Sequence, residues 1–276
     1  MQKFSSTKKR LFTTFARRFL SPQVTPFFHE STFTCSYVVA CPNTRQAIIV
    51  DPAADFAANS GRLSYGFASK LLNFVAEQKL QVKLVLETHV HADHISSAKW
   101  LQQHLDQPDV AVGSRITEVQ EVFSEVFEDP IPCDGSQFDV LLKDGEVLPL
   151  GDLDIRVMAT PGHTPACTTY VIGDAAFTGD TLFMPDVGSA RCDFPGGDAS
   201  QLWDSIQSIL SLPEDTRLYV GHDYPKEREV RFDVTVKEQR ENNIHLKGVD
   251  EKAYIEMRRT RDAQLDAPKL LLPSLQ

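Results

Sequence analysis

The chain has 276 residues, enough for one large domain or two small ones, and its 42% hydrophobic and 24% charged residues are usual for a globular protein. No apolar run approaches the roughly 20 residues of a membrane-spanning helix, so we expect no membrane partner. The formal net charge of −10 argues against nucleic acid as a partner, because phosphate contacts need a basic surface.

Residues 1–26 form a basic N-terminal extension and are predicted to be a mitochondrial transit peptide. The first 29 residues contain no acid, and their apolar side chains recur at helical spacing opposite most of the charge. The basic residues are Lys3, Lys8, Lys9, Arg10, Arg17 and Arg18. We expect a matrix location if the organism has mitochondria; the alternative is a disordered tail on a cytoplasmic protein. No repeat or linker divides the remainder, so residues 27–276 are predicted to be a single domain.

Strand and helix patterns alternate along this domain. A hairpin is predicted within residues 27–50, with strands at 37–40 and 47–50, and a helix should follow from 61 to about 79. A strand at 82–86 completes a strand–helix–strand unit that should be parallel. The remaining predictions are a helix over 95–105, a strand at 110–113, short strands through 138–179, a helix over 199–210, a strand at 217–220 and mostly helical structure over 233–267. Asp198 and Gln201 have the spacing of a helix capping box.

The segment 88–94 carries the clearest chemical signal. Three histidines and an aspartate, His89, His91, Asp93 and His94, directly follow the apolar strand at 82–86. Alternate residues of an extended chain face the same way, so His89 and His91 can face one point, while Asp93 and His94 lie where the chain turns. Imidazoles and carboxylates are good ligands for zinc, iron and manganese. The alternative, a solvated polar turn, rarely has this spacing, so we predict a metal site.

Three more ligand-type residues end predicted strands: His163 in a Thr-Pro-Gly-His-Thr turn, Asp180 after 176–179, and His222 after the strand at 217–220. Each is weak evidence alone, because a single such residue is usually structural or solvated. Together with the first motif they complete the set that a two-metal site needs. In that pairing His89, His91 and His163 hold one ion, Asp93, His94 and His222 hold the other, and Asp180 bridges them.

These motifs resemble the metallo-β-lactamase superfamily, and within it the persulfide dioxygenases, from about Phe27 to the C-terminus. The matching passages are residues 86–94, 162–165, 179–183, 190–197 and 221–224, with a similar tail at 267–270 and 274–276. The resemblance implies an α/β (α+β) chain folded as a four-layer αββα sandwich with metal between two sheets. It also implies an iron enzyme that oxidises glutathione persulfide with O₂ to sulfite and glutathione, and it favours a homodimer.

The resemblance changes the expected metal. Members of this group bind one Fe(II) through the residues that match His89, His163 and Asp180, while those matching His91, Asp93, His94 and His222 surround the ligands. Two imidazoles and one carboxylate form the facial triad of non-haem iron oxygenases, whereas zinc has no redox chemistry. Seven ligand-type residues alone would suggest two zincs, so the single-iron prediction rests on the resemblance. The thiol that carries the persulfide is not fixed by the residues.

Three residues near these motifs have two interpretations each. Arg191 is a candidate for holding the substrate or the loop beside the iron, and the alternative is a salt bridge with Asp193. Tyr224 can place its hydroxyl near the metal or pack in the core. Cys192 is expected to be a buried, inert thiol rather than a reactive one. The five cysteines lack a C-x-x-C motif, which favours reduced thiols in a reducing compartment.

The main alternative function is a dinuclear zinc hydrolase of the same fold, such as a glyoxalase-II-like thioesterase acting on acyl-glutathione. All seven ligand positions are compatible with it. Only 54 residues follow His222, however, and the glyoxalase substrate-binding region is not recognisable among them. A non-catalytic binding module of the same fold is disfavoured, because no ligand-type residue is lost.

Overall fold

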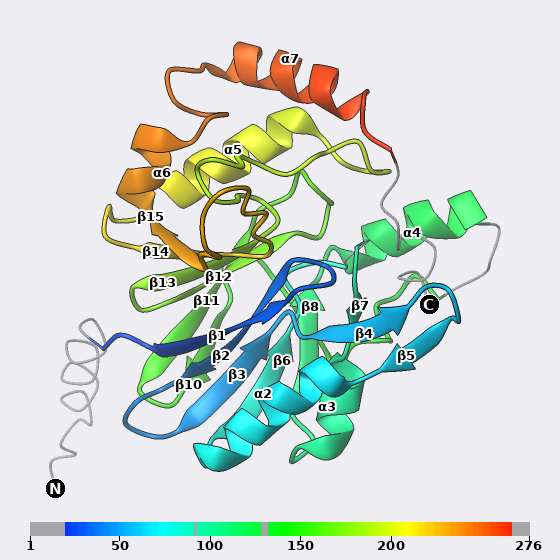
Figure 1. Cartoon of the computed structure of the whole chain (residues 1–276), viewed down its shortest axis with the longest axis vertical. Helices are drawn as coiled ribbons and strands as arrows, with labels where there is room; N and C mark the ends of the chain where they lie inside the picture. Colours follow the sequence, from blue (N-terminus) through cyan, green and yellow to red (C-terminus); the bar gives the residue numbers. More distant parts are fainter. Residues whose placement is uncertain (1–19, 91–92, 128–131, 267–276) are drawn as a thin grey trace, which may run out of the picture.

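The computed structural model describes residues 20–90, 93–127 and 132–266, which form two facing six-stranded sheets with helices on both outer faces (Figure 1). The first sheet has the order β1 (Gln23–His29), β2 (Thr34–Ala40), β3 (Gln46–Val50), β6 (Gln81–Leu86), β8 (Asp109–Gly113) and β9 (Val140–Leu142). The second has the order β10 (Val147–Leu150), β11 (Leu153–Ala159), β12 (Thr168–Ile172), β13 (Ala175–Gly179), β14 (Arg217–Val220) and β15 (Asp233–Thr235).

Helices complete the predicted αββα sandwich. The helices α2 (Gly66–Glu77) and α3 (Ala98–His104) cover the first sheet, and α5 (Ala199–Leu210) and α6 (Val236–Asn242) cover the second (Figure 1). The helix α7 (Glu251–Asp262) packs on α5. The helix α4 (Ile116–Phe127) follows β8, and a small sheet of β5 (Arg62–Ser64), β4 (Ala53–Ala57) and β7 (Ile95–Ser96) lies beside the first sheet. None of the helices in the described part of the chain has the length and apolarity to cross a membrane.

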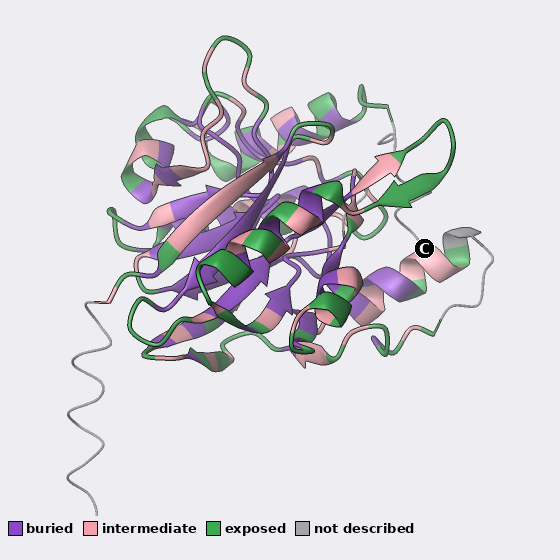
Figure 2. Ribbon diagram, turned by 60° about the horizontal axis from the view of Figure 1, so that its bottom comes forward, coloured by how far each residue is buried: buried purple, intermediate pink, exposed green. Residues whose placement is uncertain are grey.

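Four apolar clusters hold the described elements together: one between the two sheets, one on the outer face of each sheet, and a smaller one beneath α4. Between the two sheets, the Tyr37 ring packs edge-on against the rings of Phe177 and Tyr219, and these two rings stack on each other. Leu71 of α2 packs on the outer face of the first sheet, and Leu202 of α5 packs on the second. The central strands of the two large sheets are accordingly buried, whereas β5 is exposed and the helices expose one side (Figure 2).

The predicted hairpin, the parallel strand at 82–86 and the helix at 199–210 are confirmed. The strands β2 and β3 pair antiparallel, and β3 pairs parallel with β6. The Asp198 side chain accepts a hydrogen bond from the Gln201 backbone N–H, as the capping spacing predicted.

Several predicted boundaries are wrong. The helix predicted from residue 61 begins at Gly66, because 62–64 pair with β4 and the Asp55 carboxylate caps the helix through the Phe67 N–H at 2.8 Å. The helix predicted from 95 begins at Ala98, because 95–96 pair with β4 as β7. Strand β15 and a loop interrupt the helix predicted over 233–267. Strand β1 starts at Gln23, inside the segment assigned to the N-terminal extension, and most of that extension lies outside the described residues.

Candidate metal centre

The ligand-type residues meet where strands of the two sheets end. His89 follows β6 of the first sheet, and Asp180 and His222 follow β13 and β14 of the second. Strands β13 and β14 are parallel neighbours, so their carboxyl ends reach the same edge. A hydrogen bond from Cys35 N–H to the Gly221 carbonyl (2.8 Å) joins the two sheets at this edge. The site therefore depends on the packing of both sheets.

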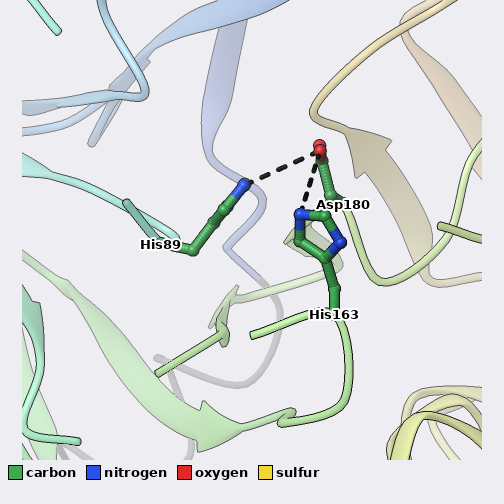
Figure 3. Close-up of side chains that lie close together, drawn as sticks. All are labelled: His89, His163 and Asp180. Carbon is green, nitrogen blue, oxygen red and sulfur yellow. Dashed lines mark ion pairs between the residues drawn. The ribbon is translucent and has the colours of Figure 1, made fainter. Parts of the chain in front are cut away.

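His89, His163 and Asp180 form the first group of candidate ligands (Figure 3). The Nε2 atoms of His89 and His163 each lie 3.7 Å from Asp180 Oδ2, and their rings are nearly perpendicular. All three side chains are buried. Two imidazole nitrogens and one carboxylate oxygen that converge in this way suit a divalent iron, zinc or manganese ion.

Asp93, His94 and His222 form a second group beside the first. His222 Nε2 lies 3.0 Å from Asp93 Oδ2 and 3.5 Å from Asp180 Oδ1, so Asp180 touches both groups. Burial opposes ionisation of Asp93, but the neighbouring His222 and hydrogen bonds from His222 and His94 hold the pKa of its carboxyl well below the ordinary value. The geometry thus brings together six of the seven predicted residues, and the seventh, His91, lies outside the described residues.

Hydrogen bonds at Nδ1 orient the two imidazoles of the first group. His163 Nδ1 donates to the Arg191 carbonyl at 2.7 Å. His89 Nδ1 lies 3.0 Å from Thr88 Oγ1, and that hydroxyl donates to Asp51 Oδ2 at 2.8 Å. A hydrogen bond that holds the proton on Nδ1 leaves the Nε2 lone pair available to a metal. Both imidazoles therefore have the tautomer that a metal ligand requires.

Two glycines allow the chain to approach this closely. Gly179 (φ 50°) ends β13 against Thr88, and a Cβ there would clash with the Thr88 hydroxyl. Gly162 (φ 138°) lies against the backbone of Leu202, where a Cβ would clash. The chain can therefore turn here, just before His163, only because residue 162 is a glycine. The sequence argument for a sharp turn at this point is confirmed.

A cavity of about 470 Å³ opens on the first group of ligands. Its walls include Asp93, His163 and Asp180 from the centre and the aromatic rings of Phe183, Phe194 and Tyr224. Basic side chains line it as well: Arg191, Arg258 and Arg261. A cavity with apolar walls and a few charged groups suits a small polar substrate.

Arg191 and Tyr224 line this cavity, whereas Cys192 is a buried neighbour of Arg191. The Arg191 guanidinium pairs with both carboxylate oxygens of Asp193 (2.6 and 2.7 Å), which is the salt bridge foreseen as its alternative role, while its carbonyl accepts from His163. Tyr224 lines the cavity and stacks on the His222 ring, with ring planes 10° apart. Burial and the nearby Asp262 raise the pKa of the Cys192 thiol to about 12, consistent with an inert cysteine.

Sequence reasoning missed two groups that support the centre. Asp51 follows strand β3, and its carboxylate accepts hydrogen bonds from the Thr88 backbone N–H and the Thr88 hydroxyl. Arg258 and Asp262, from α7, hold the loop that contains Arg191: Arg258 donates to the Ser189 carbonyl and Asp262 accepts from the Cys192 N–H. A basic and an acidic residue at i and i+4 were visible in the sequence, but nothing indicated that they would be buried.

An αββα sandwich with histidine and carboxylate groups at the shared edge of its sheets defines a class of metal-binding proteins. Residues 32–222 match the family described as the Metallo-beta-lactamase superfamily, to which this chain belongs, and that membership implies a metal.

Relatives within the superfamily include hydrolase-like proteins and persulfide dioxygenases. The chain is 48% identical over 258 residues to a beta-lactamase hydrolase-like protein of Xylella fastidiosa, covering 93% of this chain and 60% of that protein. It is 46% identical to glyoxylase B2 of Dictyostelium discoideum, over 88% of this chain and 85% of that protein. It is 31% identical to the human mitochondrial persulfide dioxygenase ETHE1, over 71% of this chain and 66% of that protein.

The solved structure of ETHE1 from Myxococcus xanthus superposes with a TM-score of 0.72 at 30% identity and covers 90% of this chain and 94% of that one. The predicted resemblance to the persulfide dioxygenases is therefore confirmed as a relationship, although other relatives have higher sequence identity.

Proposed function

We propose that the chain is a persulfide dioxygenase that uses one Fe(II) held by His89, His163 and Asp180. The observation that carries the proposal is the convergence of two Nδ1-anchored imidazoles and one carboxylate, of which His163 and Asp180 line a cavity. An Fe(II) bound by these groups would supply the redox chemistry needed to use O₂, which no side chain provides. Similarity to ETHE1 proteins in both sequence and structure supports the same reaction.

The proposed substrate is glutathione persulfide. The overall reaction converts one persulfide, one O₂ and one water to one thiol, one sulfite and two protons, with the outer sulfur oxidised and O₂ reduced. The chain would bind the thiol carrier in the cavity, where Phe183 and Phe194 exclude water and the arginines attract an anion. Tyr224 would direct its hydroxyl to the reacting sulfur from the same wall.

A single iron in the first group is proposed because the two groups differ in spacing. His222 Nε2 and Asp93 Oδ2 of the second group lie at ion-pair distance, 3.0 Å apart. The separations of 3.7 Å in the first group are too long for hydrogen bonds and leave space for an ion between the three atoms.

Two assays on the same preparation test the proposal. Purified protein loaded anaerobically with Fe(II) is expected to consume O₂ with glutathione persulfide and to release one sulfite per O₂. Metal analysis should give one iron per chain. Two zincs per chain, with no O₂ uptake, would contradict the proposal.

A dinuclear zinc thioesterase is the second candidate, because the chain resembles glyoxylase B2 along most of both lengths and Asp180 touches both ligand groups. Hydrolysis of acyl-glutathione by the zinc-loaded protein, measured beside O₂ uptake by the iron-loaded protein, separates the two functions.

We also propose that the basic segment that precedes β1 directs the chain to the mitochondrial matrix, with the cytoplasm as the alternative, and that the protein is a homodimer. Import into isolated mitochondria with and without the basic segment tests the location, and light scattering tests the oligomeric state.

A further inference from the structure

His245 lies in the wall of the cavity, away from the candidate ligands, and is buried. Its Nδ1 accepts a hydrogen bond from the Ser189 backbone N–H at 3.0 Å. A backbone N–H can only donate, so Nδ1 carries no proton and the neutral ring carries its proton on Nε2. The Ser189 hydroxyl, 3.2 Å from Nδ1 and 2.9 Å from the Tyr254 hydroxyl, belongs to the same buried network.

The Nε2 of His245 is buried and has no hydrogen-bond partner among the described residues. Buried donors are nearly always satisfied, by protein, water or a ligand. Burial and the adjacent Arg258 and Arg261 lower the pKa of His245 to about 4, so the ring is a neutral donor at physiological pH.

Arg261 lines the same cavity and differs from the other two arginines there. Arg191 pairs with Asp193, and Arg258 pairs with Asp262. No carboxylate within the described part of the chain lies at ion-pair distance from Arg261. The cavity wall therefore offers one buried N–H donor and one guanidinium that have no partner among the residues that the structure describes.

We propose that His245 and Arg261 form a carboxylate-recognition subsite, in which the Nε2–H and the guanidinium bind a carboxylate of the substrate's thiol carrier. The inference rests on the proposed function in one respect: it takes glutathione as the thiol carrier. Glutathione has two carboxylates. The subsite selects the carrier and leaves the reacting sulfur to the metal centre, so its loss changes substrate binding more than turnover.

Calorimetric binding of reduced glutathione and of its diethyl ester to the metal-loaded full chain tests the subsite without relying on turnover. His245→Ala and Arg261→Gln should each weaken glutathione binding about tenfold, as expected when a hydrogen bond to a charged group is lost. Neither variant should change binding of the ester, which has no carboxylate. His245→Gln, which restores an N–H donor, should recover part of the loss.

Tyr254→Phe is the matched control, because it removes a hydroxyl from the network behind Ser189 and leaves the cavity donors in place. It should bind glutathione like the wild type. In oxygen-uptake assays His245→Ala and Arg261→Gln should raise KM for glutathione persulfide about tenfold and keep kcat within about twofold, since one charged hydrogen bond is lost. Arg261 is exposed, so Arg261→Gln carries the test should His245→Ala fail to fold.

The outcomes separate this inference from the proposed function. A wild type that consumes no O₂, yet binds glutathione in a manner that depends on Arg261 and on the free carboxylates, supports the subsite and refutes the dioxygenase. Unchanged glutathione binding in Arg261→Gln, equal binding of the ester by the wild type, or no binding of glutathione at all overturns the subsite.

Discussion

Arg258 and Asp262, one turn apart on α7, form an ion pair of 2.7 Å in which both side chains are at most 4% exposed. The pair also holds the loop 189–192: Arg258 donates to the Ser189 carbonyl, and Asp262 accepts from the Cys192 N–H. Between them lies the Arg191 carbonyl that fixes the tautomer of His163. A helix near the C-terminus therefore positions a candidate ligand through one short loop.

Breaking this pair should destabilise the fold strongly. Asp262→Ala leaves the Arg258 charge buried without its counter-ion and should lower the free energy of unfolding by about 3–5 kcal/mol. Urea unfolding monitored by circular dichroism measures the change. The control is Glu118→Gln, which breaks an exposed pair with Arg115 on α4 and should cost less than about 1 kcal/mol. Equal losses in the two variants would show that the Arg258–Asp262 pair does not anchor the loop.

Removing a ligand of the first group should remove the metal. His163→Ala and Asp180→Ala each delete one of three candidate ligands and should lose both iron and O₂ uptake. His94→Ala, in the second group, should keep about one iron per chain and slow turnover, because changes around a metal ligand typically cost 10–100-fold. Metal analysis and oxygen electrode assays of the same samples provide the comparison. Loss of all metal in His94→Ala would favour a dinuclear centre.

Much of this centre was predictable because its ligands end strands. Periodicity located β6, β8 and β14, and the H-x-H-x-D-H spacing at 89–94 indicated a metal site. The sequence could not show which residues pair across the two sheets. His163 and Asp180 are distant from His89 in the chain, and only the packing of the two sheets on each other brings them together. The short strand β7 was missed for the same reason, because two residues become a strand only through pairing with β4.

The buried thiols should be slow to react. Burial raises the pKa of both Cys167 and Cys192 to about 12, so at pH 8 only about one thiol in ten thousand is the reactive thiolate. Iodoacetamide at pH 8 should therefore modify the partly exposed Cys133 first, and modification of Cys167 and Cys192 should require urea. Peptide mass spectrometry over time gives the order. Cys192 alkylated as fast as Cys133 in the folded protein would mean that it is accessible and activated.

The hydroxyl of Thr88 should set metal affinity through His89. Thr88→Val keeps the side-chain shape beside Gly179 but removes the oxygen that lies 3.0 Å from His89 Nδ1 and donates to Asp51. Without this partner the His89 imidazole loses its fixed orientation, and iron affinity should fall about 10–100-fold. Thr88→Ser restores the hydroxyl and is the matched control, with affinity expected close to the wild type. Competition with a chelator for Fe(II) measures both variants. An affinity for Thr88→Val equal to that of Thr88→Ser would mean that the Asp51–Thr88 hydrogen bond holds the strand end without orienting the ligand.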